Sequence, residues 1–276
     1  MTNSKFLSGL MMLVLAASML MSSSCKKDDE PDPESYVYNL QVKDQLGITG
    51  NVTFTKKSAT VTTITIRVNG ASAKSHPAHI HANSIAEGGP IVLSLNDVSA
   101  SGTSVTDVTT LDDNSAITYE QLINFDGYLN VHESATELGI IVAQADIGGN
   151  ELTSTSKSYN LASVGGSGVN GTALFQKRKD GSSMVTLTMT GLISGTQYPA
   201  NIHLGSVESI GGGPVRRALN NIDGTTGKSV TNISSLDDNT AITYDNWLLY
   251  DGYIAVRSAV LNPVVISQGN IGSNSN

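Results

Sequence analysis

The 276-residue chain has little of what several protein classes require. It contains one cysteine, which excludes a disulfide framework and a zinc site built from thiolates. Charged residues make up 14% of the chain, against about 25% in average proteins, so a coiled coil or helical bundle is not expected. The formal charge is −8 and the sequence has no basic cluster, which excludes nucleic acid as a partner.

Residues 1–24 are predicted to be a lipoprotein signal peptide. Lys5 supplies the basic start, and the apolar run from Phe6 to Met21 is too short for a transmembrane helix. Small residues then precede Cys25, the sole cysteine, and this arrangement resembles a bacterial lipoprotein signal. The resemblance implies cleavage before Cys25 and acylation of its sulfur and amino group. The alternative is an ordinary secretory signal followed by a cysteine without a role.

Residues 25–35 are expected to be an acylated tether. The letters KKDDE after Cys25 resemble the export tag of Gram-negative lipoproteins that reach the outer face of the outer membrane, although they also read as a solvated charge run. Pro31 and Pro33 stiffen the segment. We therefore predict an outer-membrane protein, displayed at the cell surface and bound to membrane lipid through Cys25.

The rest of the chain contains two copies of a related sequence, a tandem repeat. Residues 111–134 and 236–259 are identical at twelve of 24 positions at an offset of 125. The letters PAHIH at 77–81 match PANIH at 199–203 at an offset of 122. A repeat of this length indicates two whole domains. The predicted first repeat is residues 36–147, the linker is 148–155 and the second repeat is 156–273.

Apolar and polar residues alternate within each repeat, as between Ile64 and Val68 and between Val185 and Met189. Alternation with period two marks strands that have one buried and one wet face. Short strands separated by turn residues predict an all-β fold of two tandem antiparallel β-sandwiches, of immunoglobulin-like or superoxide-dismutase-like architecture.

One segment in each repeat breaks this alternation and predicts a short helix. Residues 116–125 carry apolar residues at helical spacing behind a capping box of Thr118 and Gln121, and residues 243–250 repeat the pattern. The glycines that follow, Gly127 and Gly252, are expected to take the left-handed conformation that ends a helix.

The letters PAHIH, GGPIVLSL and GYLNVHESATELGIIVAQADIG, with a short helix before the third, resemble the CHRD domain, which is named for chordin and occurs in bacterial secreted proteins. The second repeat keeps PANIHLG, GGPV and GYIAVRSA and looks like a degenerate copy. The resemblance implies an extracellular β-sandwich and carries no defined biochemical role.

The histidines also resemble, in their order, the copper ligands of Cu/Zn superoxide dismutase. That family has His-x-His on one strand and a further ligand in a later Val-His-Glu strand, where this chain has His79, His81 and His132. No histidine lies between His81 and His132, so the bridging and zinc-site histidines have no counterparts. We therefore do not expect dismutase activity.

His79, His81 and His132 are the candidate metal ligands. Residues i and i+2 of a strand share a face, so His79 and His81 point together, and a neighbouring strand would bring His132 to them. Three imidazoles with an open fourth position suit zinc or copper. His76 is a further candidate ligand. The alternative is that these histidines bond to backbone carbonyls or hydroxyls and hold the loops in place.

The second repeat has Asn201, His203 and Arg257 at the positions of the three candidate ligands, so a metal is not needed for folding. The two Leu-Asp-Asp-Asn stretches, at 111–114 and 236–239, lack the carboxylate spacing of a calcium loop and are expected to be turns.

No catalytic triad, nucleophile elbow or phosphate loop is present in the sequence. The leading hypothesis is therefore a non-enzymatic extracellular module that binds a protein or glycan partner. The alternative is a copper or zinc protein that uses the first repeat.

The lipoprotein prediction is tested by metabolic labelling with palmitate. Full-length protein produced in a Gram-negative host is expected to incorporate label, and the Cys25→Ala variant is expected to lose it, because the acylated thiol is gone. Labelling that survives this substitution contradicts the prediction.

Overall fold

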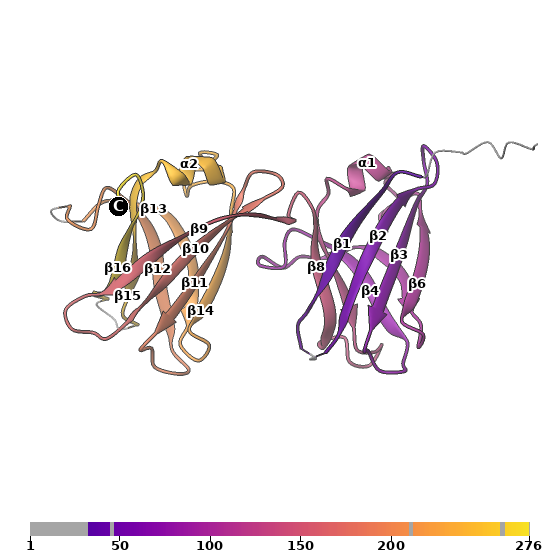
Figure 1. Cartoon of the computed structure of the whole chain (residues 1–276), viewed down its shortest axis with the longest axis horizontal. Coiled ribbons are helices and arrows are strands. Elements are labelled where there is room, and N and C mark those ends of the chain that lie inside the picture. The colour runs from indigo at the N-terminus through magenta and orange to yellow at the C-terminus, as the bar shows by residue number, and fades with distance from the viewer. Residues whose placement is uncertain (1–32, 45–46, 210–211, 260–262, 276) are drawn as a thin grey trace, which may run out of the picture. The chain divides into compact units, whose positions relative to one another are not determined.

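The computed structural model describes residues 33–44, 47–209, 212–259 and 263–275 (Figure 1). The predicted signal peptide, Cys25 and most of the tether lie outside these residues. Within the described ranges, no helix is long and apolar enough to cross a membrane.

The described residues form strands β1 to β16 and helices α1 (Tyr119–Leu122) and α2 (Tyr244–Leu248). The first eight strands are β1 (Ser35–Val42), β2 (Thr49–Lys56), β3 (Thr62–Asn69), β4 (His76–Ala82), β5 (Ile91–Val98), β6 (Thr103–Val108), β7 (Asp126–His132) and β8 (Ile141–Gly148). The others are β9 (Leu152–Ser163), β10 (Asn170–Arg178), β11 (Ser183–Thr190), β12 (Gln197–Leu204), β13 (Val215–Asp223), β14 (Lys228–Ile233), β15 (Asp251–Arg257) and β16 (Val265–Gly272).

These strands form two antiparallel sheets with the same order of neighbours. The first sheet runs β5-β4-β7-β8-β1-β2-β3-β6, and Figure 1 shows β1 between β8 and β2. The second sheet has the corresponding order, with every strand number raised by eight, and closes into a barrel where β13 meets β14. The predicted all-β class with one short helix in each repeat is confirmed, and both sheets are barrel-like.

Side chains bridge the seam between the two outermost strands of the first sheet. The backbone N–H of Asn96 donates to Thr106 Oγ1 over 2.9 Å, and Asn96 Nδ2 donates to the carbonyl of Val105 over 2.7 Å. Asn220 and Thr231 form the same backbone-to-hydroxyl bond in the second sheet. Both sheets therefore wrap around a core in the same way.

The alternating apolar residues of the strands fill these cores, so the residues between them face outward. In β4, Ala78 and Ile80 are fully buried in the core of the first sheet. Because successive side chains of a strand point to opposite faces, His79 and His81 lie on the outer face of that sheet. The fold thus places the candidate ligands outside the hydrophobic core.

Each helix is one turn long and shorter than the sequence predicts. The predicted capping box is confirmed in α1, where Thr118 accepts from the backbone of Gln121 and the Gln121 side chain accepts from the backbone of Thr118. The helix ends at Leu122, with Ile123 as its C-cap, and β7 begins three residues later at Asp126.

The predicted left-handed conformation of Gly127 is wrong. Gly127 belongs to β7 and is not among the residues with positive φ, and the same holds for Gly252 in β15. A Cβ at Gly127 would lie 2.6 Å from the Phe125 ring and 2.7 Å from the carbonyl oxygen of His81, so this glycine permits a close approach between chain segments. Gly148, at the end of β8, does take a left-handed conformation, with φ +60°, and its backbone lies against that of Phe125.

The predicted linker is only partly a loop, because residues 152–155 belong to β9.

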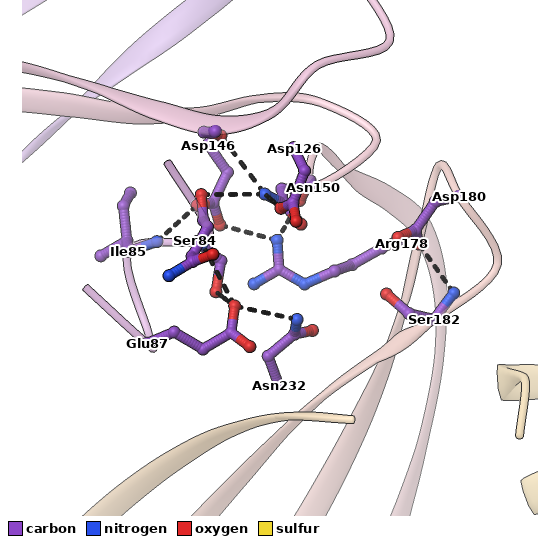
Figure 2. Close-up of polar contacts among 12 residues, drawn as sticks. Ser84, Ile85, Glu87, Asp126, Asp146, Asn150, Arg178, Asp180, Ser182 and Asn232 are labelled. Atoms are coloured by element: carbon purple, nitrogen blue, oxygen red, sulfur yellow. Dashed lines mark hydrogen bonds and ion pairs between the residues drawn. The ribbon is translucent and has the colours of Figure 1, made fainter. Parts of the chain in front are cut away.

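Next to the linker lies Arg178, which is fully buried and donates to Asp146 over 2.9 Å and to the carbonyl of Asn150 (Figure 2). Asp146 also accepts from the backbone N–H of Ile85. In the second repeat the side-chain oxygen of Asn270 accepts the equivalent hydrogen bond from the backbone N–H of Val207. An asparagine can thus accept this backbone bond, and the carboxylate of Asp146 additionally supplies the negative charge that pairs with Arg178.

We predict that Asp146→Asn destabilises the protein by about 3 kcal/mol, because it keeps an acceptor for Ile85 but leaves a buried guanidinium without its counter-charge. Urea unfolding measures the change. The matched control is Asn270→Asp, the reverse substitution in the second repeat, which is expected to change the free energy of unfolding by less than about 1 kcal/mol. Equal effects of the two substitutions would refute the role of the charge.

Candidate metal site

The pairing of β4 with β7 brings the three candidate ligands together. His79 lies opposite Asn130, and His81 lies opposite Tyr128. His132 ends β7, beyond the residue that pairs with Ala78. One ring nitrogen from each of His79, His81 and His132 lies within 4.8 Å of the other two. The expected convergence of the three side chains is therefore present in the fold.

The strand pairing is irregular beside His81 and beside His132. The pairing of β4 with β5 shifts between Ile80 and His81, and that of β7 with β8 shifts between Val131 and His132. Such bulges re-aim a side chain relative to a regular strand. The ring centroids of His79 and His132 are 5.1 Å apart, and those of His79 and His81 are 6.2 Å apart.

Backbone carbonyls orient two of the rings. His81 Nδ1 donates to the carbonyl of Gly89 over 3.0 Å, and His132 Nδ1 donates to that of Leu138 over 2.6 Å. Because a carbonyl only accepts, the neutral rings carry their proton on Nδ1 and a lone pair on Nε2. Both Nε2 atoms are buried and lack a hydrogen-bond partner among the described residues. This is the usual arrangement of histidines that bind metal.

The local electrostatics favour the neutral form of the His79 and His132 rings. Burial, and then the proximity of His132 and His81, lower the pKa of His79. Burial likewise lowers the pKa of His132, against the opposing effect of its bond to Leu138. Metal binding requires the neutral imidazole. Nitrogen–metal bonds of about 2.0–2.1 Å would hold the ring nitrogens about 3.4 Å apart in a tetrahedral site, so modest inward rotation suffices.

His76 is not part of this cluster. Its Nδ1 lies 2.9 Å from the carbonyl oxygen of His132, and its Nε2 lies 2.9 Å from that of Ser72. Carbonyls therefore occupy both ring nitrogens. His76 therefore contacts the backbone of the candidate ligand His132 and is not itself one of the three clustered histidines.

The second repeat keeps the framework without the full set of ligands. His203 Nδ1 donates to the carbonyl of Gly213 over 2.7 Å, and the ring stacks on Tyr253 at 4.8 Å. His81 stacks on Tyr128 in the same way, at 4.7 Å. Because both repeats have these contacts, they are part of the fold. At the position of His81 and His203 this agrees with the alternative that the histidine bonds to a backbone carbonyl and holds a loop in place.

The other two positions differ between the repeats. Asn201 stands in place of His79, and Arg257 stands in place of His132. Arg257 Nη1 lies 3.5 Å from the carbonyl oxygen of Pro263, the counterpart of Leu138. The three-histidine cluster is therefore particular to the first repeat.

Asn130 is a polar residue at the site that the sequence analysis did not single out. It is 7% exposed, and its Oδ1 is buried without a hydrogen-bond partner in the part of the chain that the structure describes. Its counterpart in the second repeat is Ala255. Comparison of the two repeats at this position is the signal that could have found it.

The Leu-Asp-Asp-Asn stretches are turns, as predicted. Asp112 accepts from the backbone N–H and hydroxyl of Ser94, and Asp113 accepts from Ser115. Asn114 has φ 67°, a conformation that asparagine tolerates in turns. The carboxylates of this turn hold neighbouring backbone in place.

Comparisons with protein-family models, curated proteins and solved structures found no match. The resemblances to the CHRD domain and to superoxide dismutase stay predictions from the sequence.

The lowered pKa values predict how the metal-free protein responds to acid. The pKa values of His79 and His132 fall below the ordinary 6.5 on folding, so the unfolded chain takes up protons first as the pH drops. The free energy of unfolding is therefore expected to decrease from about pH 6.5 downward, until the pH passes the folded-state pKa values. Chemical denaturation at a series of pH values measures it.

His79→Asn, which installs the residue of the second repeat, is the matched variant for this measurement. It removes the contribution of His79 and should make the decrease in stability shallower. Identical pH dependence in the two proteins would contradict the assignment.

Proposed function

We propose that the first repeat binds one copper or zinc ion through His79, His81 and His132. The observation that carries this proposal is the convergence of three ring nitrogens within 4.8 Å, with the Nε2 atoms of His81 and His132 buried and without a hydrogen-bond partner among the described residues. A buried acceptor without a partner is costly, and a bound ion would satisfy all three rings together.

The donor set favours these metals over others. Imidazole nitrogen suits copper and zinc, whereas calcium and magnesium take oxygen ligands, and the cluster contains no carboxylate. The carbonyls of Gly89 and Leu138 supply the outer contacts that fix ring orientation in such sites.

The proposal is metal binding without dismutase activity. The chain has five histidines, and the remaining two, His76 and His203, are bonded to carbonyls. The ligands for a second, zinc ion of the dismutase type are therefore not available in the sequence. An ion at this site would be held and presented by the protein.

The wider setting of the proposal comes from the sequence. We infer a lipoprotein with two CHRD-like β-sandwiches of immunoglobulin-like or superoxide-dismutase-like architecture, at 36–147 and 156–273, anchored to the outer membrane through acylated Cys25. In this setting the metal site belongs to an extracellular binding module, and its protein or glycan partners stay a prediction.

The proposal is tested by the metal content of the purified protein after loading with zinc or copper and gel filtration. The wild type is expected to retain a single ion per chain. The double variant His79→Asn/His132→Arg is expected to retain almost none, because two of the three ligands are gone. Circular dichroism should be unchanged, since the second repeat folds with these residues. Equal and near-zero metal in both proteins would overturn the proposal.

A further inference from the structure

We propose that Asn130 is a fourth ligand of this site, through its side-chain oxygen, and that it makes the site prefer divalent ions over Cu⁺. The inference rests on the proposed metal site and adds to it the residue that completes the coordination and selects the ion.

The register of the sheet places Asn130 among the three histidines. Asn130 is directly opposite His79 across the β4–β7 pairing, and it precedes His132 by two residues on the same face of β7. Side chains directly opposite one another in an antiparallel pair have Cβ atoms about 4.5–5.5 Å apart. The Asn130 amide is therefore a neighbour of two candidate ligands at once.

No group among the described residues competes for the side-chain oxygen of Asn130. Asn130 is 7% exposed, and its Oδ1 forms no hydrogen bond within the described ranges. A buried polar oxygen is unfavourable unless something satisfies it. Buried ring nitrogens of His79, His81 and His132 are in the same condition, so a single cation would satisfy all four groups.

The second repeat shows that the fold itself does not require this amide. Ala255 occupies the equivalent position, is fully buried and pairs with Asn201 in the same register. The exchange of Asn130 for Ala255 accompanies the exchanges of His79 for Asn201 and of His132 for Arg257. The amide is thus present in the repeat that has the three histidines and absent from the repeat that does not.

The chemistry of an amide oxygen gives the selectivity. Zinc takes four ligands in a tetrahedron, and Cu²⁺ accepts nitrogen and oxygen donors. Cu⁺ favours soft sulfur ligands, so an oxygen donor adds little to its binding. A neutral amide completes a divalent site without adding charge and leaves the affinity for Cu⁺ to the three imidazoles.

Asn130→Ala tests the inference in the full-length protein, because it installs the residue that the second repeat already tolerates. Competition with a chromophoric chelator is expected to show Zn²⁺ affinity reduced by about 10-fold or more. Affinity for Cu⁺ is expected to change by less than about 3-fold, since a soft ion gains little from the lost oxygen. Asn130→Asp, which keeps an oxygen donor, should retain the Zn²⁺ affinity of the wild type or exceed it.

The electron paramagnetic resonance spectrum of bound Cu²⁺ gives a readout that a merely structural role would not move. The spectrum of Asn130→Ala should differ from that of the wild type, because one equatorial or axial donor has changed. Wild-type protein that binds Zn²⁺, together with an Asn130→Ala variant of unchanged affinity and spectrum, would overturn the inference. Wild-type protein that binds neither ion would overturn the proposed function instead.

Building the same site in the second repeat provides an independent test of the role of Asn130. In the His79→Asn/His132→Arg background, Asn201→His/Arg257→His is expected to create a three-histidine site with His203. Adding Ala255→Asn should raise its Zn²⁺ affinity by about 10-fold or more. Equal affinities with and without the added amide would count against the role of Asn130.

Discussion

The register between β4 and β7 is the constraint on which the candidate site depends. It sets His79 opposite Asn130 and His81 opposite Tyr128 on the outer face, while Ala78 packs into the core on the other side. A slip of one residue would exchange the two faces and bury imidazoles in the hydrophobic core. The same hydrophobic pattern that fixes the barrel therefore also fixes the cluster.

The loops that follow β4 and β7 orient the rings of His81 and His132. Carbonyls of Gly89 and Leu138 hold the proton-bearing nitrogens of His81 and His132, so the lone pairs face the cluster. His76 bonds to the carbonyl of His132 from a different segment. Ligand orientation is thus built from backbone groups, which do not depend on neighbouring side-chain identity.

The sequence could predict the parts of this arrangement that follow from periodicity. The strand alternation, the shared face of His79 and His81 and the capping box at Thr118 all follow from local spacing. The approach of His132 depended on which strands pair, and the bulge beside it has no local sequence signal. Gly127 was misassigned because a glycine after a helix and a glycine at a close chain approach look alike in sequence.

The two repeats together separate what the barrel needs from what the first repeat adds. Stacking of His81 on Tyr128 and the bond to a loop carbonyl recur at His203, so they stabilise the fold in both places. Arg257 places a guanidinium where the first repeat has His132, and a fixed positive charge there repels a cation. Because the framework is shared, the difference between a site that can hold a cation and one that repels it lies in a few outward-facing side chains.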